Sequence, residues 1–328
     1  MGKYIFQELN DTLIWGKFSQ TSKEYSLFND SIYLNSFGGK YKLYLVKKGD
    51  YIKAGLVVIL KDEKNLKVDD LVIYSGILFE DGSAQKSSKV TLERFEISNF
   101  IIEELDKLYE HIEFVLSPYV DDIRAFLWHN YHSSKDSDKY SVSIRYTSYL
   151  DISSLSNFIN EEDSEIFKNL ETLRKRNIRE ARKKEAYTIV TNEVELFILY
   201  YKKLMLKQDQ IVSMEKLSNI KNLITTLVNK KKAKIYVSKN SQNEIQYITI
   251  FAWDKFRAYY LFGAPNPDAS ERYRGTISFW DAFIDLAHNG VITVDMEGVN
   301  SPQRGWFKLS FGGNLKTYYH IKKAYCEE

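Results

Sequence analysis

The chain has 328 residues, of which 44% are hydrophobic, and its 46 Lys and Arg residues against 44 Asp and Glu residues give a net charge of +2. This length is typical of two domains, and the balanced charge argues against a protein whose whole surface binds nucleic acid, although it permits a local basic groove. The single cysteine, Cys326, excludes a disulfide framework and a cysteine-rich zinc site. Because no signal-peptide core and no membrane-length apolar run is present, we expect a cytoplasmic protein without integral membrane association.

The first half of the chain alternates between strand-like and helix-like patterns. Alternating apolar residues predict strands, and apolar residues three and four positions apart predict helices. In chain order, we expect a helical turn at 13–18, strands at 41–46, 52–60 and 71–79, a helix at 98–109, and strands at 113–116 and 141–149.

The second half begins with helices and then returns to the pattern of the first half. An Asn-Gly pair after the last of these helices is typical of a helix C-terminus. In chain order, we expect helices at 162–184, 193–206 and 214–229, strands at 234–237, 246–252 and 257–263, a helix at 278–288, and strands at 292–294 and 315–322.

The two halves share one order of elements, which indicates a tandem duplication. We therefore predict an α+β protein of two domains, 1–152 and 153–328, each with a mixed, mostly antiparallel sheet flanked by helices. Alternatively, the last strand returns to the first domain. A Ser-Pro pair followed by Arg and Trp also occurs late in each half: Ser117, Pro118, Arg124 and Trp128 in the first, and Ser301, Pro302, Arg304 and Trp306 in the second.

Two carboxylates follow the short strand at 292–294. Asp295 and Glu297 are alternate residues, so a strand would place them on one face, where either carboxylate could serve as a general base. A turn at Asn300 follows, and then the cations Arg304 and Lys308. This pattern fits a site for a polar or anionic ligand. It also fits a strand–turn–strand corner in which the carboxylates form salt bridges to those cations.

The segment ERYRGTI at 271–277 is expected to be a loop between a strand and a helix. Arg272, Arg274, Gly275 and Thr276 could present guanidinium and backbone N–H groups to a pyrophosphate at the helix N-terminus. The alternative is a solvated loop with two exposed arginines, because such loops need Gly and polar residues in any case.

A basic run lies within the expected helix at 162–184. Lys175, Arg179 and Arg182 share one helical face, so together they could contact RNA or the phosphates of a carrier such as coenzyme A. A solvated helix face is the alternative. The five histidines are scattered without metal-ligand spacing, so we expect no metal site.

Several segments of the second half resemble the FemABX family. They read LRKRNIREARKKEA, AYYLFGA, a helix ending in HNG, ITVDMEG and FKLSFGG. That family comprises peptidoglycan-bridge aminoacyltransferases and FemAB-type or BioF-type acetyltransferases of the GNAT superfamily. The resemblance extends over residues 11–319 and is best at 173–313. It implies two tandem GNAT-like (acyl-CoA N-acyltransferase) domains.

The resemblance also implies transfer of an acyl or aminoacyl group to an amine. GNAT enzymes bind the donor pyrophosphate through an Arg/Gln-x-x-Gly-x-Gly/Ala loop, and here Ile277 replaces the final small residue. The donor is then expected over Arg272, Arg274, Gly275, Thr276 and the strand at Tyr259. Glu297 or Asp295 would accept the proton and Tyr260 would assist the leaving group. Arg124, Asn300, Arg304 and Lys308 would bind the acceptor.

Three functions follow from this resemblance. The first is an acyl-CoA-dependent N-acyltransferase that acts on an amine, such as an amino sugar or a cell-surface glycan or peptidoglycan precursor. The second is a FemX-like aminoacyltransferase with aminoacyl-tRNA as its donor and tRNA as a partner. The third is a non-catalytic relative that binds a glycan or a nucleotide, because the first domain shows no donor loop.

Overall fold

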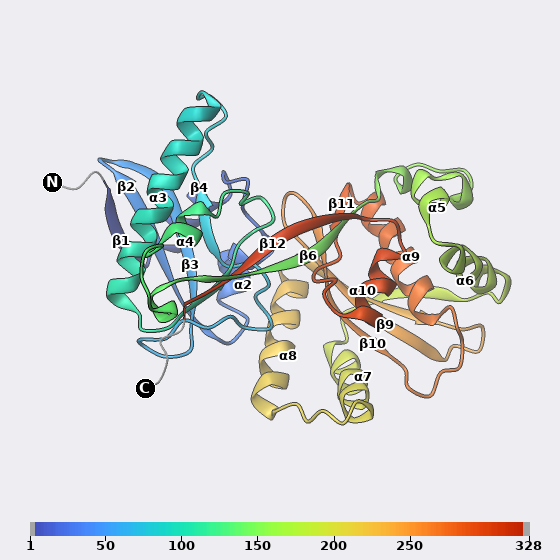
Figure 1. The fold of residues 1–328 in the computed structure, drawn as a ribbon. Helices are drawn as coiled ribbons and strands as arrows, with labels where there is room; N and C mark the ends of the chain where they lie inside the picture. The colour runs from blue at the N-terminus through green and yellow to red at the C-terminus, as the bar shows by residue number, and fades with distance from the viewer. Residues whose placement is uncertain (1–3, 324–328) are drawn as a thin grey trace. The chain divides into compact units, whose positions relative to one another are not determined.

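The computed structural model describes residues 4–323, so Cys326 lies outside the described part. The chain forms two compact units (Figure 1). The first contains the described residues up to Arg145 together with those from Thr317 onward, and the second is Tyr146–Lys316. Strands β6 (Ser141–Asp151) and β12 (Asn314–Lys323) each contribute residues to both units. The units thus divide at 145/146, whereas the sequence predicted 152/153.

The first unit is built on an antiparallel sheet in the order β1-β2-β3-β4. Helix α3 packs on this sheet, because Ile97, Ile101 and Leu105 share one apolar core with side chains of β2 and β3. Outside the sheet, β5 pairs with β12. The elements are β1 (Ile5–Leu9), α1 (Thr12–Ser19), η1 (Leu27–Asn29), α2 (Ser31–Leu34), β2 (Lys40–Lys48), β3 (Tyr51–Leu60), β4 (Gly76–Phe79), α3 (Ser87–Leu108), β5 (Ile112–Val115), α4 (Arg124–Trp128) and η2 (Asp136–Asp138).

The second unit contains a sheet in the order β6-β11-β10-β9-β8-β7. Its strand pairs are antiparallel except for β10 and β11, which are parallel. The elements are η3 (Ser153–Leu155), η4 (Glu161–Asp163), α5 (Glu165–Asn169), α6 (Thr172–Lys183), β7 (Tyr187–Thr191), α7 (Val194–Lys207), α8 (Met214–Asn229), β8 (Ala233–Lys239), β9 (Ile245–Trp253), β10 (Ala258–Pro265), α9 (Arg274–His288), β11 (Thr293–Asp295) and α10 (Pro302–Leu309).

Helices cover both faces of the second unit's sheet (Figure 1). On one face, Phe279 of α9 packs against Phe251 of β9 and Tyr260 of β10, with ring centroids 5.6 and 4.6 Å away. On the other, Phe197 of α7 contacts Phe262 of β10 at 5.7 Å. The two faces of β10 therefore meet different helices, as expected for a sheet that is apolar on both sides.

Several predicted elements differ from the structure. The helix expected at 162–184 is interrupted because Leu170 and Glu171 have extended backbones, and the Glu171 N–H donates instead to the Ser310 carbonyl. The strand expected at 71–79 is reduced to β4, which starts at Gly76 with φ of +92°. Helix α3 begins at Ser87, not at 98, and the short strands β1 and β7 were not predicted.

Two further differences change the candidate site. Helix α9 begins at Arg274, so most of the expected donor loop is the first helical turn. The segment after Ser301 is helix α10, where a turn was predicted, and Pro302 starts it as proline often does. No helix in the described range 4–323 is long and apolar enough to span a membrane.

Candidate functional site

The parallel strands β10 and β11 separate soon after they begin. They pair only at Ala258 with Val294 and at Tyr259 with Asp295. Strand β11 then ends, while β10 continues to Pro265 and stays paired with β9. Within residues 4–323, no strand pairs with the other side of β10 past Tyr259. This leaves a free edge of β10, a row of backbone N–H and C=O groups that an extended ligand can bind. We call the region between this free edge and the residues that follow β11 the split.

A β-bulge lies at the start of this free edge. The register between β10 and β9 shifts between Tyr260 and Phe262, so Leu261 has no register partner on β9. A bulge re-aims the backbone locally and is common beside active sites. The Leu261 backbone N–H is therefore a candidate donor to a ligand in the split.

Asp295 fixes the chain where β11 ends. Its side chain is fully buried and accepts hydrogen bonds from Thr147 Oγ1 at 2.5 Å and from the Glu297 backbone N–H at 2.8 Å. Glu297 itself has a left-handed backbone, with φ of +54°, which is uncommon for a residue other than glycine. The sequence analysis predicted that the two carboxylates are alternate residues of one strand, and this is wrong. The strand ends at Asp295, and Asp295 holds the turn that presents Glu297.

The Glu297 carboxyl is buried and incompletely paired. Its side chain is only 7% exposed, and Oε1 has no hydrogen-bond partner. Burial raises the pKa of this carboxyl well above its usual range; the Lys308 cation lowers that pKa and the charge of Asp295 raises it further. A buried carboxyl with a raised pKa and a free oxygen is suited to accept a proton from a bound ligand.

Lys308 extends from α10 toward Glu297. Its Nζ donates to the Gly298 carbonyl at 3.1 Å, lies 3.5 Å from the Glu297 carbonyl and is 5.1 Å from the centre of the Tyr260 ring. Burial lowers the pKa of the Lys308 ammonium, while Glu297 and Asp295 act in the opposite direction. The structure thus brings together Asp295, Glu297, Lys308 and Tyr260, as the sequence analysis expected for one site.

Two tyrosines form the wall of the split next to Glu297. The hydroxyls of Tyr260 on β10 and Tyr247 on β9 are hydrogen-bonded to each other, and burial raises the pKa of both phenols. Both phenols are therefore protonated and able to donate at neutral pH. A Cβ on Gly263 would collide with the Tyr260 hydroxyl and lie 2.7 Å from the Tyr247 hydroxyl. Tyr247 and Gly263 were not predicted, although a glycine inside a strand often marks such a close approach.

The predicted donor-binding residues have different surroundings. The Arg274 guanidinium donates to the Asn266 carbonyl at 3.1 Å and to the Ala269 carbonyl, so it holds the loop before α9. Thr276 Oγ1 accepts from Arg174 Nη1 at 2.5 Å and from Asn177 Nδ2 at 3.1 Å. Three groups remain for a donor phosphate: the backbone N–H of buried Gly275, the rest of that helical turn and the exposed side chain of Arg272.

Arg174 is a residue that the sequence analysis passed over. Besides its bond to Thr276, it lies 4.9 Å from the centre of the Phe307 ring, and its Nε is buried without a partner. Burial lowers the pKa of its guanidinium. A cationic group partly buried at the start of α9 adds to the positive potential there. Nothing in the run of seven basic residues distinguished Arg174 from its neighbours.

The other predicted contacts lie outside the split. The Tyr259 phenol is fully buried and donates to Asp254 Oδ2 at 2.6 Å. Asn300 uses its side chain to pair with the backbone of Tyr146, at 2.8 and 3.1 Å. Exposed Arg304 donates to Gln208 Oε1 at 3.2 Å, and Arg124, in the first unit, is paired with Asp122 at 2.6 Å.

The three basic residues predicted to contact phosphate all have partners within the second unit. Lys175 donates to the Lys168 carbonyl at 2.8 Å, and Arg179 forms two bonds to Glu162, at 2.9 and 2.5 Å. Arg182 bonds to Glu161 and to Asp281, at 2.9 and 2.6 Å. Their common face therefore attaches α6 to its neighbours.

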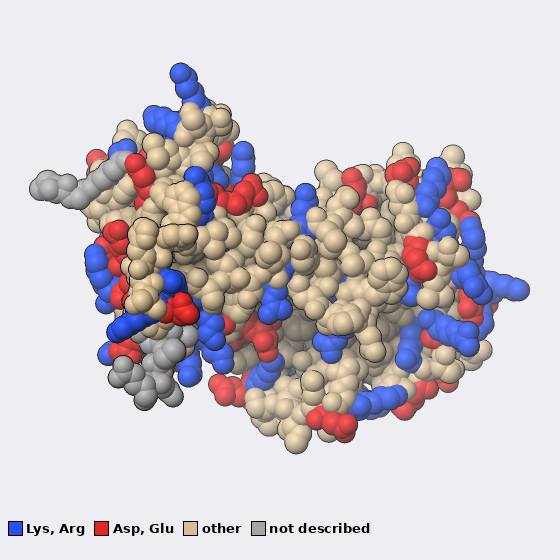
Figure 2. Space-filling model, in the orientation of Figure 1, with Lys and Arg blue, Asp and Glu red and all other residues tan. Residues whose placement is uncertain are grey.

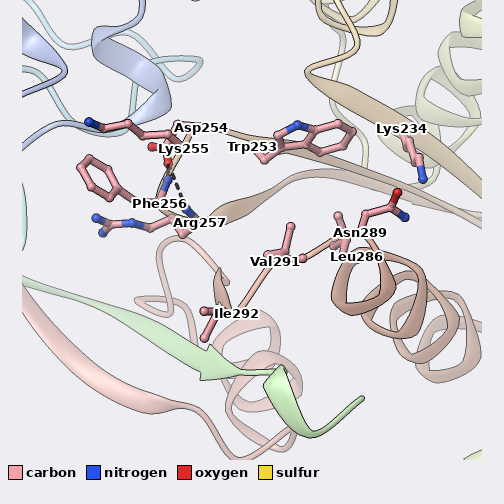
Figure 3. Close-up of a pocket in the computed structure, with 11 residues that line it drawn as sticks. Lys234, Trp253, Asp254, Lys255, Phe256, Arg257, Leu286, Asn289, Val291 and Ile292 are labelled. Atoms are coloured by element: carbon pink, nitrogen blue, oxygen red, sulfur yellow. Dashed lines mark hydrogen bonds between the residues drawn. The ribbon is translucent and has the colours of Figure 1, made fainter. Parts of the chain in front are cut away.

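A separate cavity of about 410 Å³ lies at the opposite ends of β10 and β11 (Figure 3). It is lined by the turn before β10 and the segment before β11, including Trp253, Asn289 and Val291. Two of its cations are matched, because Lys234 pairs with Asp285 at 2.7 Å and Arg257 donates to the Tyr149 hydroxyl at 2.6 Å. None of the predicted site residues lines it. Ligands of open α/β sheets bind at the carboxyl ends of parallel strands, which favours the split.

No group of three or more His, Cys, Asp or Glu side chains in residues 4–323 is arranged to hold a metal ion. The side chains at the split are a carboxyl, an ammonium and two phenols. These groups can move protons and polarise a carbonyl by themselves.

Comparisons with known proteins identify the fold. No protein-family model matches the sequence, and no curated protein matches it significantly. Solved structures do match. A crystal structure of FemX aligns with a TM-score of 0.64 at 11% identity, over 95% of this chain and 96% of that one. A tandem GNAT protein from the clavulanic acid biosynthesis pathway aligns with a TM-score of 0.54 at 10% identity, over 97% of both chains.

A third match is the structure of L-PGS from Bacillus licheniformis, with a TM-score of 0.52 at 11% identity, over 97% of this chain and 93% of that one. The chain therefore has the tandem GNAT-like, FemABX-type fold that the sequence resemblance implied. At these identities the likeness concerns the fold, and the activity has to be argued from the site.

Proposed function

We propose that the second unit is an N-acyltransferase that moves an acyl group from an acyl-thioester, acyl-CoA, to an amine. One observation carries this proposal: the free edge of β10 begins after Tyr259, whose register partner Asp295 stands two residues before the buried, incompletely paired Glu297. A backbone edge can bind the amide groups of an extended donor, and a carboxyl with a raised pKa can take the proton that an amine must lose.

The donor would lie along β10. Its amides would hydrogen-bond to the free edge as an added strand does, and its phosphates would meet the first turn of α9 and the side chain of Arg272. Helix N-termini bind anions because their first N–H groups are unpaired and the helix dipole is positive there. This orientation brings the acyl carbonyl to the bulge at Leu261 and close to Tyr260.

The chemical step is a direct attack of the amine on the acyl carbonyl. The ammonium first loses one proton to Glu297. The neutral amine then forms the C–N bond, the C–S bond breaks, and the nitrogen passes its second proton to the Tyr260–Tyr247 pair, where it replaces the proton given to the leaving thiolate. The Leu261 N–H would stabilise the oxyanion, and the Tyr260 hydroxyl would donate a proton to the leaving thiolate, with Tyr247 orienting it. Lys308 sets the charge around Glu297. Holding both reactants in the split supplies much of the rate enhancement.

A second candidate donor is aminoacyl-tRNA, the alternative raised by the sequence. It is favoured by one observation: Arg274 and Thr276, the side chains expected to bind a pyrophosphate, are occupied by contacts within the protein. The reaction would keep the same attack and the same base, with an ester oxygen leaving instead of a thiolate. The acceptor in either case would be a sugar- or peptide-linked amine, consistent with a role in cell-surface glycan or peptidoglycan precursor synthesis.

Titration calorimetry with acetyl-CoA and with charged tRNA, followed by mass spectrometry of products from a panel of amino sugars and amino-sugar nucleotides, tests the proposal. Binding of acetyl-CoA and a product heavier by one acetyl group support it. Salt-sensitive tRNA binding and an aminoacylated product identify the second donor. Binding of a glycan or nucleotide without any product would show the non-catalytic relative and overturn the enzyme assignment.

A further inference from the structure

The connection between α7 and α8 exposes large apolar side chains to solvent. Ile211 is 95% exposed, Met214 73% and Leu206 68%. They lie within nine residues of one another, where the two helices are joined at the lower edge of the second unit (Figure 1). Single exposed apolar residues need no explanation, but three at one helix connection form a patch that favours an apolar partner.

Three lysines flank Leu206 at the end of α7. Lys202 and Lys203 precede Leu206 by four and three positions on α7, and Lys207 follows it. No ion pair involves any of the three within residues 4–323, but Lys207 donates to the Pro267 carbonyl at 3.4 Å and Lys203 lies over the Tyr200 ring at 5.3 Å. At the rise of an α-helix, about 1.5 Å per residue, Lys202 and Lys203 stand roughly 5 Å behind Leu206. We define these six residues, Lys202, Lys203, Leu206, Lys207, Ile211 and Met214, as the α7–α8 tip.

The tip is connected to the candidate site. Gln208, which ends α7, accepts a hydrogen bond from Arg304 at 3.2 Å. Arg304 belongs to α10, the helix that carries Lys308.

We propose that the α7–α8 tip docks on a membrane surface that contains anionic lipids. Aliphatic side chains enter the acyl boundary to a depth of about 5–10 Å in such contacts, and lysines placed roughly 5 Å behind them reach the phosphate layer. Charge contributes less than apolar burial, because Asp209 and Glu215 lie in the same segment. Acidic and basic side chains are likewise interspersed over the visible face of the molecule (Figure 2).

Other occupants fit the tip less well. Three side chains bury far less than the roughly 800 Å² per partner that a stable dimer needs. Single-stranded nucleic acid is usually bound by aromatic stacking within a basic groove, whereas the tip has no aromatic side chain and lies in the same segment as two carboxylates. The proposal concerns where the protein acts and is independent of the transfer reaction.

Co-sedimentation of the full chain with vesicles tests the proposal. We expect binding to phosphatidylcholine vesicles containing about 30% phosphatidylglycerol and weaker binding to phosphatidylcholine alone. Leu206→Ser with Ile211→Ser should weaken binding about tenfold or more. Lys202→Gln with Lys203→Gln should weaken it by less, and only at low salt. Ile159→Ser, which changes a fully exposed isoleucine elsewhere in the second unit, should bind like the wild type.

A gain-of-binding variant guards against misfolded proteins, because Ile211→Trp should strengthen binding without loss of thermal stability. Glu297→Gln should bind vesicles normally, so a failure of the proposed reaction is distinguishable from a failure of docking. Absence of wild-type binding, or equal binding by the Leu206→Ser/Ile211→Ser variant, overturns the proposal. So does a concentration-dependent dimer, or tRNA binding, that the same variant abolishes.

Discussion

The two units place different chemistry after corresponding strands. In each unit a short strand, β5 or β11, leads through a Ser-Pro pair to a short helix, α4 or α10. At the end of β11 and just after it the chain buries Asp295 and Glu297, and α10 returns Lys308 to them. After β5 it buries Leu116 and Ser117, and α4 returns Phe126, whose ring lies 5.7 Å from that of Phe114.

The neighbouring strand differs in the same way. In the first unit, β4 and β5 do not pair, and the Ser75 N–H reaches the Val115 carbonyl at 2.9 Å just before β4 begins. A side chain at Gly76 would meet Phe114 at 3.1 Å and Leu116 at 3.2 Å. Apolar side chains thus fill the position that in the second unit is lined by a carboxyl, an ammonium and two phenols. One order of elements therefore supports either packing or chemistry, and the residues after the strand decide which.

The largest expected effect comes from removing the Glu297 carboxyl, which has no counterpart after β5 in the first unit. Glu297→Gln should lower kcat about 10²–10⁴-fold, because an amide cannot accept the proton from the amine. Steady-state kinetics with the amine varied at saturating donor measure this. The matched control is Glu24→Gln in the first unit, which also changes a buried glutamate and should leave kcat unchanged. Full turnover by Glu297→Gln would show that Glu297 is not the base.

Lys308→Met tests the charge balance around Glu297. The Lys308 cation lowers the pKa of the Glu297 carboxyl, so its removal should raise that pKa further. The base must be deprotonated to act, so the rising limb of kcat/KM against pH reports its pKa. In the wild type this limb should lie above the usual glutamate pKa of about 4.3, and in Lys308→Met it should move to still higher pH. Arg304→Met, one helical turn away on the same helix, should shift the limb less. An unchanged limb would show that Lys308 does not act on the base.

Gly263→Ala tests the close approach at the tyrosine pair. The added methyl group would displace the hydroxyls of Tyr260 and Tyr247. Overpacking of this kind costs about 1–3 kcal/mol, which urea denaturation measures. Gly16→Ala in the first unit is the control, because nothing lies within 4 Å of a Cβ at that position. Equal stability of the two variants would indicate that the tyrosines move aside at no cost.

The two buried glutamates should respond oppositely to neutralisation. Burial raises the pKa of Glu297, so the folded state binds a proton more tightly than the unfolded state, and the associated stability is lost as pH rises through the folded pKa. At neutral pH, Glu297→Gln should therefore increase the free energy of unfolding, on the order of 1 kcal/mol.

Glu24 is instead satisfied, because it accepts from Arg94 at 2.9 Å, from the Ser22 hydroxyl at 2.6 Å and from the Phe79 N–H at 3.1 Å. Glu24→Gln should lower the free energy of unfolding by about 1–3 kcal/mol. Denaturation of both variants at pH 7 gives the comparison, and a change of the same sign in both would contradict it.

The sequence predicted the architecture better than the details of the site. Hydrophobic periodicity placed α8, which buries one regular face. Two apolar runs on either side of a turn with Gly49 placed the hairpin of β2 and β3, in which consecutive residues are buried. It missed the break at Leu170, where tertiary contacts favour an extended backbone over helix propensity. At the site, residue types singled out Glu297 and Lys308. The left-handed backbone of Glu297 and the role of Arg174 depend on contacts distant in sequence, which no local pattern records.

The smallest expected effect concerns Arg124, the first unit's predicted acceptor ligand. It is exposed, paired with Asp122 at 2.6 Å, and lies 5.4 Å from the centre of the Trp128 ring. Arg124→Ala should change the free energy of unfolding by less than about 0.5–1 kcal/mol, because exposed ion pairs contribute little. If the Arg124 guanidinium binds the acceptor before the transition state, Arg124→Ala should raise KM for the amine by about tenfold and leave kcat unchanged. Asp122→Ala frees the arginine and should not raise that KM. If neither variant changes KM, the first unit does not bind the acceptor through Arg124. The two units would then differ in substrate recognition as well as in catalysis.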